Sequence, residues 1–341
     1  MTGADVSTVG VIVNPHAGKD IRRLVSAAGQ TSDAVKIGIV RRAVVGALEQ
    51  GAERILLSSD SHRLGERAVE GVDGRIEFVE GPSTGSHLDT VAAARSMWKE
   101  DAGAVVALGG DGTCRDVAVG WPDAPLIPIS TGTNNVFPFA LDGTTAGVAA
   151  ALVATDTIGI AEISHHAKRI ALHVDEPGRV HDDIALVEAA LIDTAFVGAR
   201  AVSDPSAIRW VVAAVAEPAS TGVASIAGRV HPVGRRDGGG VLIRLGPGGR
   251  RVRVPLAPGT FATVDVRSVE PLAPGETIDL PGGGVLAYDG ERTTPVGEGS
   301  TITVSVETSG PRIIDVGAVL TRAARSRLFD VHPRRKDVHG D

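Results

Sequence analysis

The first half of the chain alternates short apolar runs with segments of helical character. The apolar runs are almost uninterrupted, as expected for strands of a parallel sheet that is covered on both faces. This alternation predicts an α/β fold built on a parallel sheet. The predicted strands are Val9 to Val13, Arg54 to Leu57, Arg75 to Val79, Ala104 to Leu108 and Leu126 to Ile129.

Helices are predicted between these strands. Ser86 with Asp89 three residues later has the spacing of a capping box, so a helix is expected to begin there. The predicted helices are Asp20 to Ala28, Arg41 to Gln50, Ser61 to Glu70, Ser86 to Lys99, Thr113 to Gly120 and Thr144 to Val153.

The pattern changes after about Asp156, where strand-like segments are separated by turns such as Pro258-Gly259 and Pro274-Gly275. Such a pattern is typical of a β-rich domain, and we expect a sandwich. One helix is predicted inside it, with Asp204 as N-cap and Pro205 at its first position, extending to about Glu217.

These patterns divide the chain into three parts. Residues 1–155 are expected to form an α/β domain and residues 156–315 a β-sandwich domain. Residues 316–341 would hold a final amphipathic helix, about Val316 to Phe329, and a tail, with the helix packing back on the first domain.

Composition narrows the class of protein. The 341 residues are enough for two domains of ordinary size. A net charge of −7 and an aromatic share of 3% disfavour a nucleic-acid surface, which normally combines basic and stacking residues. A single cysteine, Cys114, suits a reducing compartment. No secretory signal or apolar stretch of membrane-spanning length is present, so we expect a cytoplasmic protein without stable membrane association.

The strongest chemical signal is the run Gly109-Gly110-Asp111-Gly112-Thr113, where a buried strand turns into a helix. Glycines let the backbone approach a ligand, and a helix N-terminus favours phosphate. A carboxylate beside phosphate needs a divalent cation or a hydroxyl group, so Asp111 indicates a metal or a reacting hydroxyl. Taken alone, the run also fits an ordinary Asp-Gly turn.

Two further polar loops come after strands of the same predicted sheet. Asn14 to Lys19 follows the first strand and ends in Gly18 and Lys19, whose ammonium can neutralise phosphate. It is not a Walker A loop, because position 13 is Val rather than Gly. Ligands of parallel sheets bind at the carboxyl ends of the strands, where all three loops are expected. The third loop contributes Thr131, Gly132, Thr133, Asn134 and Asn135.

These motifs, in this order, resemble the nucleotide-binding motifs of the superfamily of NAD kinases, diacylglycerol kinases and sphingosine kinases. Within it, Val11 to Arg23, Val105 to Arg115, Pro125 to Pro138 and Phe196 to Arg200 resemble the acetoin-catabolism protein X branch, which is ATP-NAD kinase-like. The resemblance is clear over about the first 155 residues and patchier beyond.

The resemblance implies a Rossmann-like α/β domain, a β-sandwich domain and an active site between them that binds ATP and magnesium. Gly109, Gly110, Gly112 and Thr113 would contact donor phosphates, and Asp111 would lie near Mg²⁺, directly or through water, or near the reacting hydroxyl. The nucleotide site would include Asn14, Gly18 and Lys19, with Thr133 and Asn134 at the cleft.

A downstream motif, Asp289-Gly290-Glu291-Arg292, is similar to the Asp-Gly-Glu element of the lipid-kinase branch. By this similarity the acidic side chains of Asp289 and Glu291 are candidate catalytic residues, with Glu291 or Asp111 as the base. An Asp-Gly pair between strands is equally the signature of a plain hairpin turn. Members of the superfamily often form homo-oligomers, so a homodimer is expected by resemblance.

The expected reaction is phosphoryl transfer from ATP to an alcohol on a small soluble acceptor. An authentic NAD kinase is the first rival, although the Thr-x-x-Gly-Ser-Thr-Ala-Tyr stretch and the Asn-Glu pair of NAD kinases have no counterpart here. A nucleotide-binding regulatory protein without catalysis is the second. A dehydrogenase ranks last, because no Gly-x-Gly-x-x-Gly turn follows the first strand.

Overall fold

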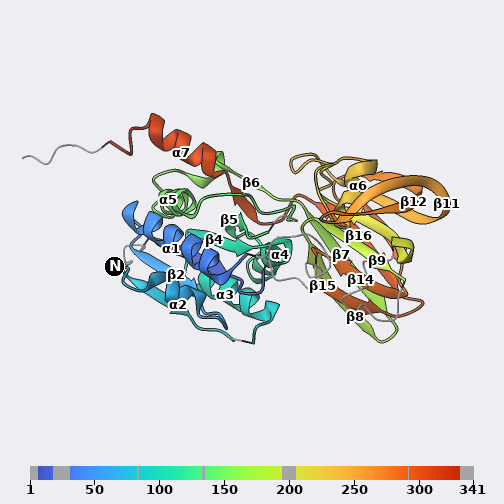
Figure 1. Ribbon diagram of the computed structural model, residues 1–341, viewed down its shortest axis with the longest axis horizontal. Helices are drawn as coiled ribbons and strands as arrows, with labels where there is room; N and C mark the ends of the chain where they lie inside the picture. Colours follow the sequence, from blue (N-terminus) through green and yellow to red (C-terminus); the bar gives the residue numbers. More distant parts are fainter. Residues whose placement is uncertain are drawn as a thin grey trace, which may run out of the picture.

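Two layered bodies lie side by side in the computed structural model (Figure 1). The structure describes residues 7–17, 31–82, 84–132, 135–193, 205–290 and 292–330. An α/β body is formed mainly by the first half of the chain, and a β-rich body by most of the second half.

The α/β body is built on a seven-stranded sheet of order β3-β2-β1-β4-β5-β17-β6. The strands from β3 to β17 run parallel, and β6 pairs antiparallel with β17 at the edge. The predicted parallel α/β sheet is therefore confirmed. The strands are β1 (Thr8–Val13), β2 (Arg54–Ser58), β3 (Ile76–Val79), β4 (Ala104–Gly109), β5 (Pro125–Ser130), β6 (Ser164–His166) and β17 (Arg312–Ile314).

Helices cover both faces of this sheet. On one face the apolar core joins α1 (Asp33–Glu49), α2 (Leu64–Val69), α5 (Gly143–Ala154) and α7 (Val316–Arg325) to the strands. On the other face, α3 (His87–Lys99) and α4 (Asp111–Gly120) contribute to a second core. A serine side chain caps the N-terminus of α1 and of α3, through Ser32 and Ser86. The predicted helix Asp20 to Ala28 lies outside the described residues.

The β-rich body is a sandwich with a helix on its outer face, as predicted in outline. A six-stranded sheet of order β12-β11-β10-β9-β14-β15 packs on a four-stranded sheet of order β13-β16-β7-β8. The short helix α6 (Ala224–Val230) packs on the other side of the six-stranded sheet. The strands are β7 (Arg169–Glu176), β8 (Arg179–Ala185), β9 (Glu188–Ile192), β10 (Ile208–Ala213), β11 (Gly240–Ala257), β12 (Thr260–Leu272), β13 (Thr277–Pro281), β14 (Gly284–Tyr288), β15 (Arg292–Val296) and β16 (Thr301–Glu307).

The helix predicted from Asp204 to Glu217 is wrong. The chain instead forms a short 3-10 turn, η4 (Pro205–Ala207), followed by β10. Strand β10 pairs with β9 on one side and β11 on the other. Its apolar side chains are buried because the four-stranded sheet covers one face and α6 covers the other. A short, continuous apolar run fits a buried strand as well as a buried helix, and sheet pairing decided the outcome.

The α/β body is not one continuous stretch of chain. A second 3-10 turn, η2 (Ile160–Glu162), leads into β6, and the chain returns from the sandwich through β17 into α7. Val316, Val319 and Ala323 of α7 lie in the core shared with α5. No helix among the described residues combines the length and apolar character that a membrane span requires.

Candidate functional site

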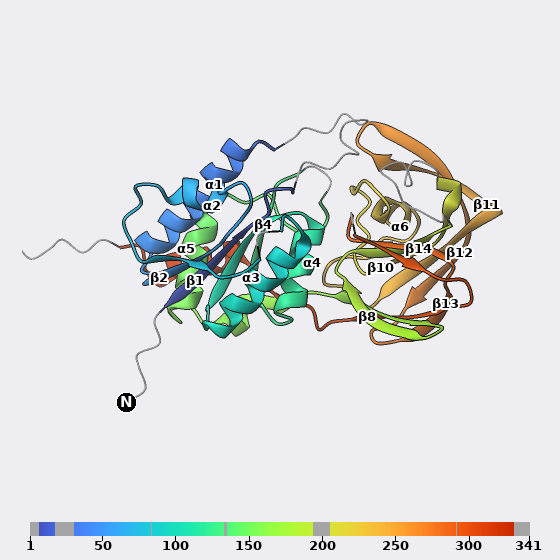
Figure 2. The ribbon, with the colours of Figure 1, turned by 90° about the horizontal axis from the view of Figure 1, so that it is seen from below.

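A cavity of about 330 Å³ is lined by both bodies. Its α/β wall contains the end of β1 and the beginnings of α3 and α4, at the carboxyl edge of the parallel strands. Its sandwich wall contains the turn after β14, the segment before α6 and the turn between β11 and β12. Ligands of α/β sheets bind at this edge, and the volume suits a small-molecule site. Figure 2 shows the two bodies from below, with α4 beside the sandwich.

Helix α4 presents its N-terminus to the cavity. Gly110 is the N-cap and provides no side-chain cap, and the first-turn residues Asp111, Gly112 and Thr113 line the cavity wall. The first N–H groups of a helix have no intrahelical acceptor, and the helix dipole makes this end positive. The start of α4 can therefore receive an anion.

The glycines before α4 are needed by the protein's own packing. A Cβ atom at Gly109 would lie 2.3 Å from Thr113 Oγ1, and one at Gly110 would lie 2.9 Å from Asn135 Oδ1. Neither glycine has a positive φ angle. Close approach of protein atoms, rather than an unusual backbone conformation, excludes a larger residue at Gly109, while at Gly110 a larger residue would displace the end of the Asn135 side chain.

The loop after β1 is fixed to two helices. Asn14 Nδ2 donates to Thr113 Oγ1 at 2.9 Å, while Asn14 Oδ1 accepts from the backbone N–H of His16 at 2.9 Å. The buried Lys36 of α1 donates through Nζ to the Pro15 carbonyl at 2.6 Å. These contacts hold Asn14 in the cavity wall beside the start of α4.

The Asp111 carboxylate holds the chain that comes after β5. Its Oδ1 atom accepts from the backbone N–H of Val136 at 3.0 Å and of Phe137 at 2.7 Å. Burial raises the pKa of Asp111 to about 6, and these amide hydrogen bonds oppose the rise. Arg235, from the sandwich, donates to the carbonyls of the same two residues. Residues of both bodies thus hold the Val136–Phe137 backbone by hydrogen bonds.

The Asp289 carboxylate plays a matching part in the sandwich. Asp289 lies in the β14–β15 turn with a φ of 46°, followed by Gly290 with a φ of 88°. It accepts from the backbone N–H of Leu186 at 2.7 Å and of Val187 at 2.8 Å. Burial raises its pKa to about 7, and the negative charge of Asp111 adds to the rise. The turn is thus a hairpin turn and also part of the cavity wall.

The two Asp-Gly turns meet across the interface. A Cβ atom at Gly112 would lie 3.4 Å from the backbone oxygen of Asp289. Apolar residues beside the turns continue the contact, because Val117 of α4 and Leu186 of the sandwich belong to one core. The geometry places two carboxylates of raised pKa at one cavity, next to a helix N-terminus.

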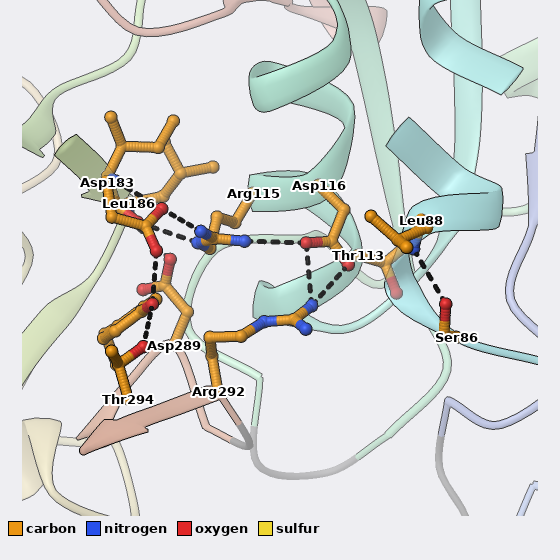
Figure 3. A network of polar contacts seen from close by, with 12 residues as sticks. Ser86, Leu88, Thr113, Arg115, Asp116, Asp183, Leu186, Asp289, Arg292 and Thr294 are labelled. Atoms are coloured by element: carbon orange, nitrogen blue, oxygen red, sulfur yellow. Dashed lines mark hydrogen bonds and ion pairs between the residues drawn. The ribbon is translucent and has the colours of Figure 1, made fainter. Parts of the chain in front are cut away.

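A chain of charged residues crosses the interface beside these turns (Figure 3). Arg115 Nη1 donates to Asp116 Oδ1 at 2.8 Å, and Arg115 Nη2 donates to Asp183 of β8. Arg292 Nη2 donates to both oxygens of Asp116, at 2.9 and 3.0 Å. The Tyr288 hydroxyl donates to Asp183. The Arg115 guanidinium carbon lies over the Tyr288 ring, 5.0 Å from the ring centroid. Burial raises the pKa of Asp116 to about 6, and the two arginines oppose the rise.

The structure brings together part of the predicted site. Three predicted residues are next to the lining in sequence or close to it, but do not themselves line the cavity: Gly109, Thr131 and Gly132. Five lie outside the described residues: Gly18, Lys19, Thr133, Asn134 and Glu291. The motif Phe196 to Arg200 also lies there. The predicted residues that line the cavity are Asn14, Gly110, Asp111, Gly112, Thr113, Asn135 and Asp289.

The third predicted loop is held by its own side chains. Asn135 Nδ2 donates to Ser130 Oγ at 2.8 Å, and the backbone N–H of Thr131 donates to the Gly109 carbonyl at 3.1 Å. Across the ranges that the structure describes, no group of three or more His, Cys, Asp or Glu side chains is placed to hold a metal ion.

Sequence reasoning missed several residues that line the cavity or hold the segments around it. Arg115 and Asp116 come shortly after the glycine-rich run, so a charged pair inside a buried helix was their only signal. Lys36 gave a similar signal, as a lysine among the apolar positions of α1. Arg235 gave none, because its partners are about 98 residues away in the sequence.

Comparison with known proteins agrees with this architecture. Residues 9–157 match the family model of the ATP-NAD kinase N-terminal domain, and residues 168–309 match that of the acetoin catabolism protein X C-terminal domain. Yeast NADH kinase, solved in complex with NADH, has a similar fold, with a TM-score of 0.55 at 12% identity. That similarity covers 98% of this chain and 91% of the yeast chain.

Two relatives match by sequence. An uncharacterized protein of Archaeoglobus fulgidus is 31% identical over 131 residues, which is 38% of this chain and 36% of that protein. The acetoin catabolism protein X of Cupriavidus necator is 34% identical over 342 residues, covering 96% of this chain and 95% of that protein. The chain therefore belongs to the acetoin catabolism protein X family, and its fold is that of NAD kinases.

Proposed function

We propose that this protein transfers a phosphoryl group from ATP to a hydroxyl group of a small soluble acceptor. One observation carries the proposal: Asp111 and Asp289, from different bodies, line one cavity with pKa values raised to about 6 and 7. They lie beside the uncapped N-terminus of α4. A proton acceptor and an anion site are thus adjacent, as phosphoryl transfer to an alcohol requires.

The donor phosphates would bind the α/β wall. The first-turn N–H groups of α4 and the positive end of its dipole favour phosphate oxygens. Asn14 lies beside them through its bond to Thr113. The sequence adds Gly18 and Lys19 from the loop after β1, together with Thr133 and Asn134, as further donor contacts.

Magnesium fits this wall through the donor rather than through a protein cage. The described residues offer no cluster of three or more metal-binding side chains. Magnesium usually keeps several waters and binds one or two carboxylates plus substrate phosphates. Asp111 retains unused lone pairs and could bind such an ion through water. When bound, the ion would neutralise charge on the donor phosphates.

Asp289 suits the role of proton acceptor better than Asp111, because its pKa of about 7 is nearer to neutral pH than the value of about 6 for Asp111. In the proposed step, the acceptor oxygen forms a bond to the γ-phosphorus, the bond from that phosphorus to the bridging oxygen breaks, and ADP leaves with the electron pair. The hydroxyl proton passes to the Asp289 carboxylate, whose pKa of about 7 suits a base at neutral pH. Asp111 would orient the loop that ends at Phe137. Glu291, next to this turn, stays a sequence-based alternative for the base.

The proposal is tested by release of ADP from ATP and Mg²⁺ with a panel of small alcohols. A wild-type protein that turns over at least one alcohol, and loses that turnover in Asp289→Asn, supports it. Nucleotide binding measured by calorimetry should survive this substitution, because the proposed donor contacts come from the α/β wall and an Asn side chain keeps an oxygen for the Leu186 and Val187 amides. Binding of ATP without turnover of any alcohol would instead support a nucleotide-binding regulatory protein.

An authentic NAD kinase is a second candidate, favoured by the match of residues 9–157 to the ATP-NAD kinase N-terminal domain. In that case the acceptor hydroxyl belongs to NAD. Incubation with ATP, Mg²⁺ and NAD would then yield NADP, and the absence of NADP removes this candidate.

A further inference from the structure

Two arginines of the interface network differ in how their nitrogens are used. Each nitrogen of the Arg115 guanidinium has an acceptor. Nε donates to the Ile184 carbonyl at 2.8 Å, and the two terminal nitrogens donate to Asp116 and Asp183. Its side chain is only 5% exposed. Arg115 therefore serves the junction between the two bodies.

The Arg292 guanidinium, by contrast, has nitrogens without an acceptor among the described residues. Within the described part of the chain, only its Nη2 atom has an acceptor, the carboxylate of Asp116. Its Nε atom is buried without an acceptor among the described residues. The side chain lines the cavity and remains 23% exposed. A guanidinium presents its donors as a fork that matches carboxylate and phosphate oxygens, so Arg292 is prepared for an anionic group.

The rest of the wall leaves only one place for such a group. Arg292 is the only arginine or lysine among the described lining residues, whereas six carboxylate side chains line the same cavity. An anion elsewhere in the sandwich wall would meet no arginine or lysine among the described lining residues. The carboxylates of the lining are Asp60, Asp89, Asp111, Asp116, Glu188 and Asp289.

The position of Arg292 points to the acceptor rather than the donor. Arg292 begins β15, three residues after Asp289 in the same hairpin, and its guanidinium reaches across the interface to Asp116 in the second turn of α4, beyond the first-turn N–H groups. A second unused polar group, the buried Thr221 Oγ1 atom, also belongs to the sandwich wall and has no hydrogen-bond partner among the described residues. Leu256 and Pro258 add apolar surface for a short carbon skeleton.

We infer that the acceptor is a small alcohol that carries an anionic oxyacid group, a carboxylate or a phosphate, and that Arg292 binds this group. Asp116 holds the guanidinium in place, and the acceptor hydroxyl is thereby directed to Asp289. The inference rests on the proposed function for naming the ligand as the phosphoryl acceptor, while the anion site itself rests on Arg292 and its neighbours.

The test compares alcohols that differ only in the anionic group. Glycerate and glycerol phosphate are each compared with glycerol, in ADP release from ATP and Mg²⁺ by the wild type, Arg292→Gln and Arg292→Lys. The wild type should prefer an anionic alcohol in kcat/KM by about 100-fold, the scale of one charged hydrogen-bonded pair. Arg292→Gln should reduce the preference to within a few-fold, and Arg292→Lys should keep part of it. The stronger of the two anionic alcohols identifies the oxyacid.

Arg244→Gln is the matched control, since Arg244 pairs with Glu270 on the sandwich and does not line the described cavity. It should keep the full preference. Thermal melting verifies that the Arg292 variants fold, and binding of glycerate and glycerol phosphate is measured by calorimetry with ADP present. Anion binding that disappears in Arg292→Gln without any turnover supports the anion site and defeats the kinase proposal. Equal use or binding of neutral and anionic alcohols, or a preference that survives Arg292→Gln, overturns the inference.

Discussion

The Asp111-Gly112 pair at the start of α4 and the Asp289-Gly290 turn after β14 have matching roles in the walls of one cavity. Each buried carboxylate accepts two backbone N–H groups of its own body, Val136 and Phe137 for Asp111 and Leu186 and Val187 for Asp289. The two turns differ in the element that each one opens. Asp111 opens a helix and so adjoins an anion site, whereas Asp289 opens a strand that begins with Arg292.

This difference separates the proposed roles. A helix start suits the donor phosphates, and a hairpin with a basic residue suits an acceptor with its own charge. Substitutions that affect one turn and spare the other can therefore show whether the two roles are separate.

The largest effect is expected from Asp289→Asn. Loss of a proton acceptor lowers turnover by about 10²- to 10⁴-fold. The measurement is kcat for the best alcohol of the panel, with the Kd for ATP as the companion value. A kcat within threefold of the wild type would remove Asp289 from the chemistry and leave its hairpin a structural turn.

Asp111→Asn should lower turnover by at least about two orders of magnitude while keeping the fold, because the variant lacks the negative charge proposed to meet Mg²⁺ on the donor phosphates. The amide oxygen of Asn can still accept from Val136 and Phe137, so the loop stays in place. Asp111→Ala leaves both buried N–H groups without their acceptor and should lower the free energy of unfolding by about 2–4 kcal/mol. Urea unfolding of the two variants checks this contrast, and equal stabilities would contradict the proposed role of the oxygen.

The pH dependence of stability should differ between the wild type and Asp289→Asn. Burial raises the pKa of Asp289 from 3.8 to about 7, so the folded state binds a proton that the unfolded state has released. The resulting stabilisation is full below about pH 4 and is lost as the pH rises to about 7. Within that window the wild type should lose stability by about 1 kcal/mol per pH unit more than the variant. Urea unfolding from pH 4.5 to 7.5 gives the difference, and parallel curves would contradict the raised pKa.

The smallest effect compares the glycines of the two turns. Gly290 has a φ of 88°, which other L-residues adopt only with strain, so Gly290→Ala should lower the free energy of unfolding by about 1–2 kcal/mol. Gly112 lies in the first turn of α4 without a positive φ, so Gly112→Ala should be neutral or slightly stabilising. Thermal melting of the two variants measures this difference. A larger loss of stability in Gly112→Ala than in Gly290→Ala would contradict the assigned turn geometry.

The sequence predicted the elements of the α/β body better than those of the sandwich, of which it gave only the outline. Buried parallel strands such as Val9 to Val13 are recognisable because both faces demand apolar residues. The run before α4 is recognisable because strand, glycines and helix start are contiguous. By contrast, Ile208 to Ala213 gave the same apolar signal for a strand as for a helix, and the pairing that decides between them comes from distant residues.

The interface network could not be predicted from local patterns. Arg115 and Asp183 are 68 residues apart, and Arg292 and Asp116 are 176 residues apart. Only the docking of the two bodies brings these charges together. The turn at Asp289 had two interpretations in the sequence, and its hydrogen bonds to Leu186 and Val187 became visible only in the folded chain.

A crystal of this protein soaked with a non-hydrolysable ATP analogue and Mg²⁺ tests whether the cavity binds a nucleotide triphosphate. We expect the phosphates at the N-terminus of α4, beside Asn14 and Thr113, with the terminal phosphate facing Asp289. A nucleotide bound elsewhere, or no nucleotide at saturating concentration, would contradict the roles assigned to both turns.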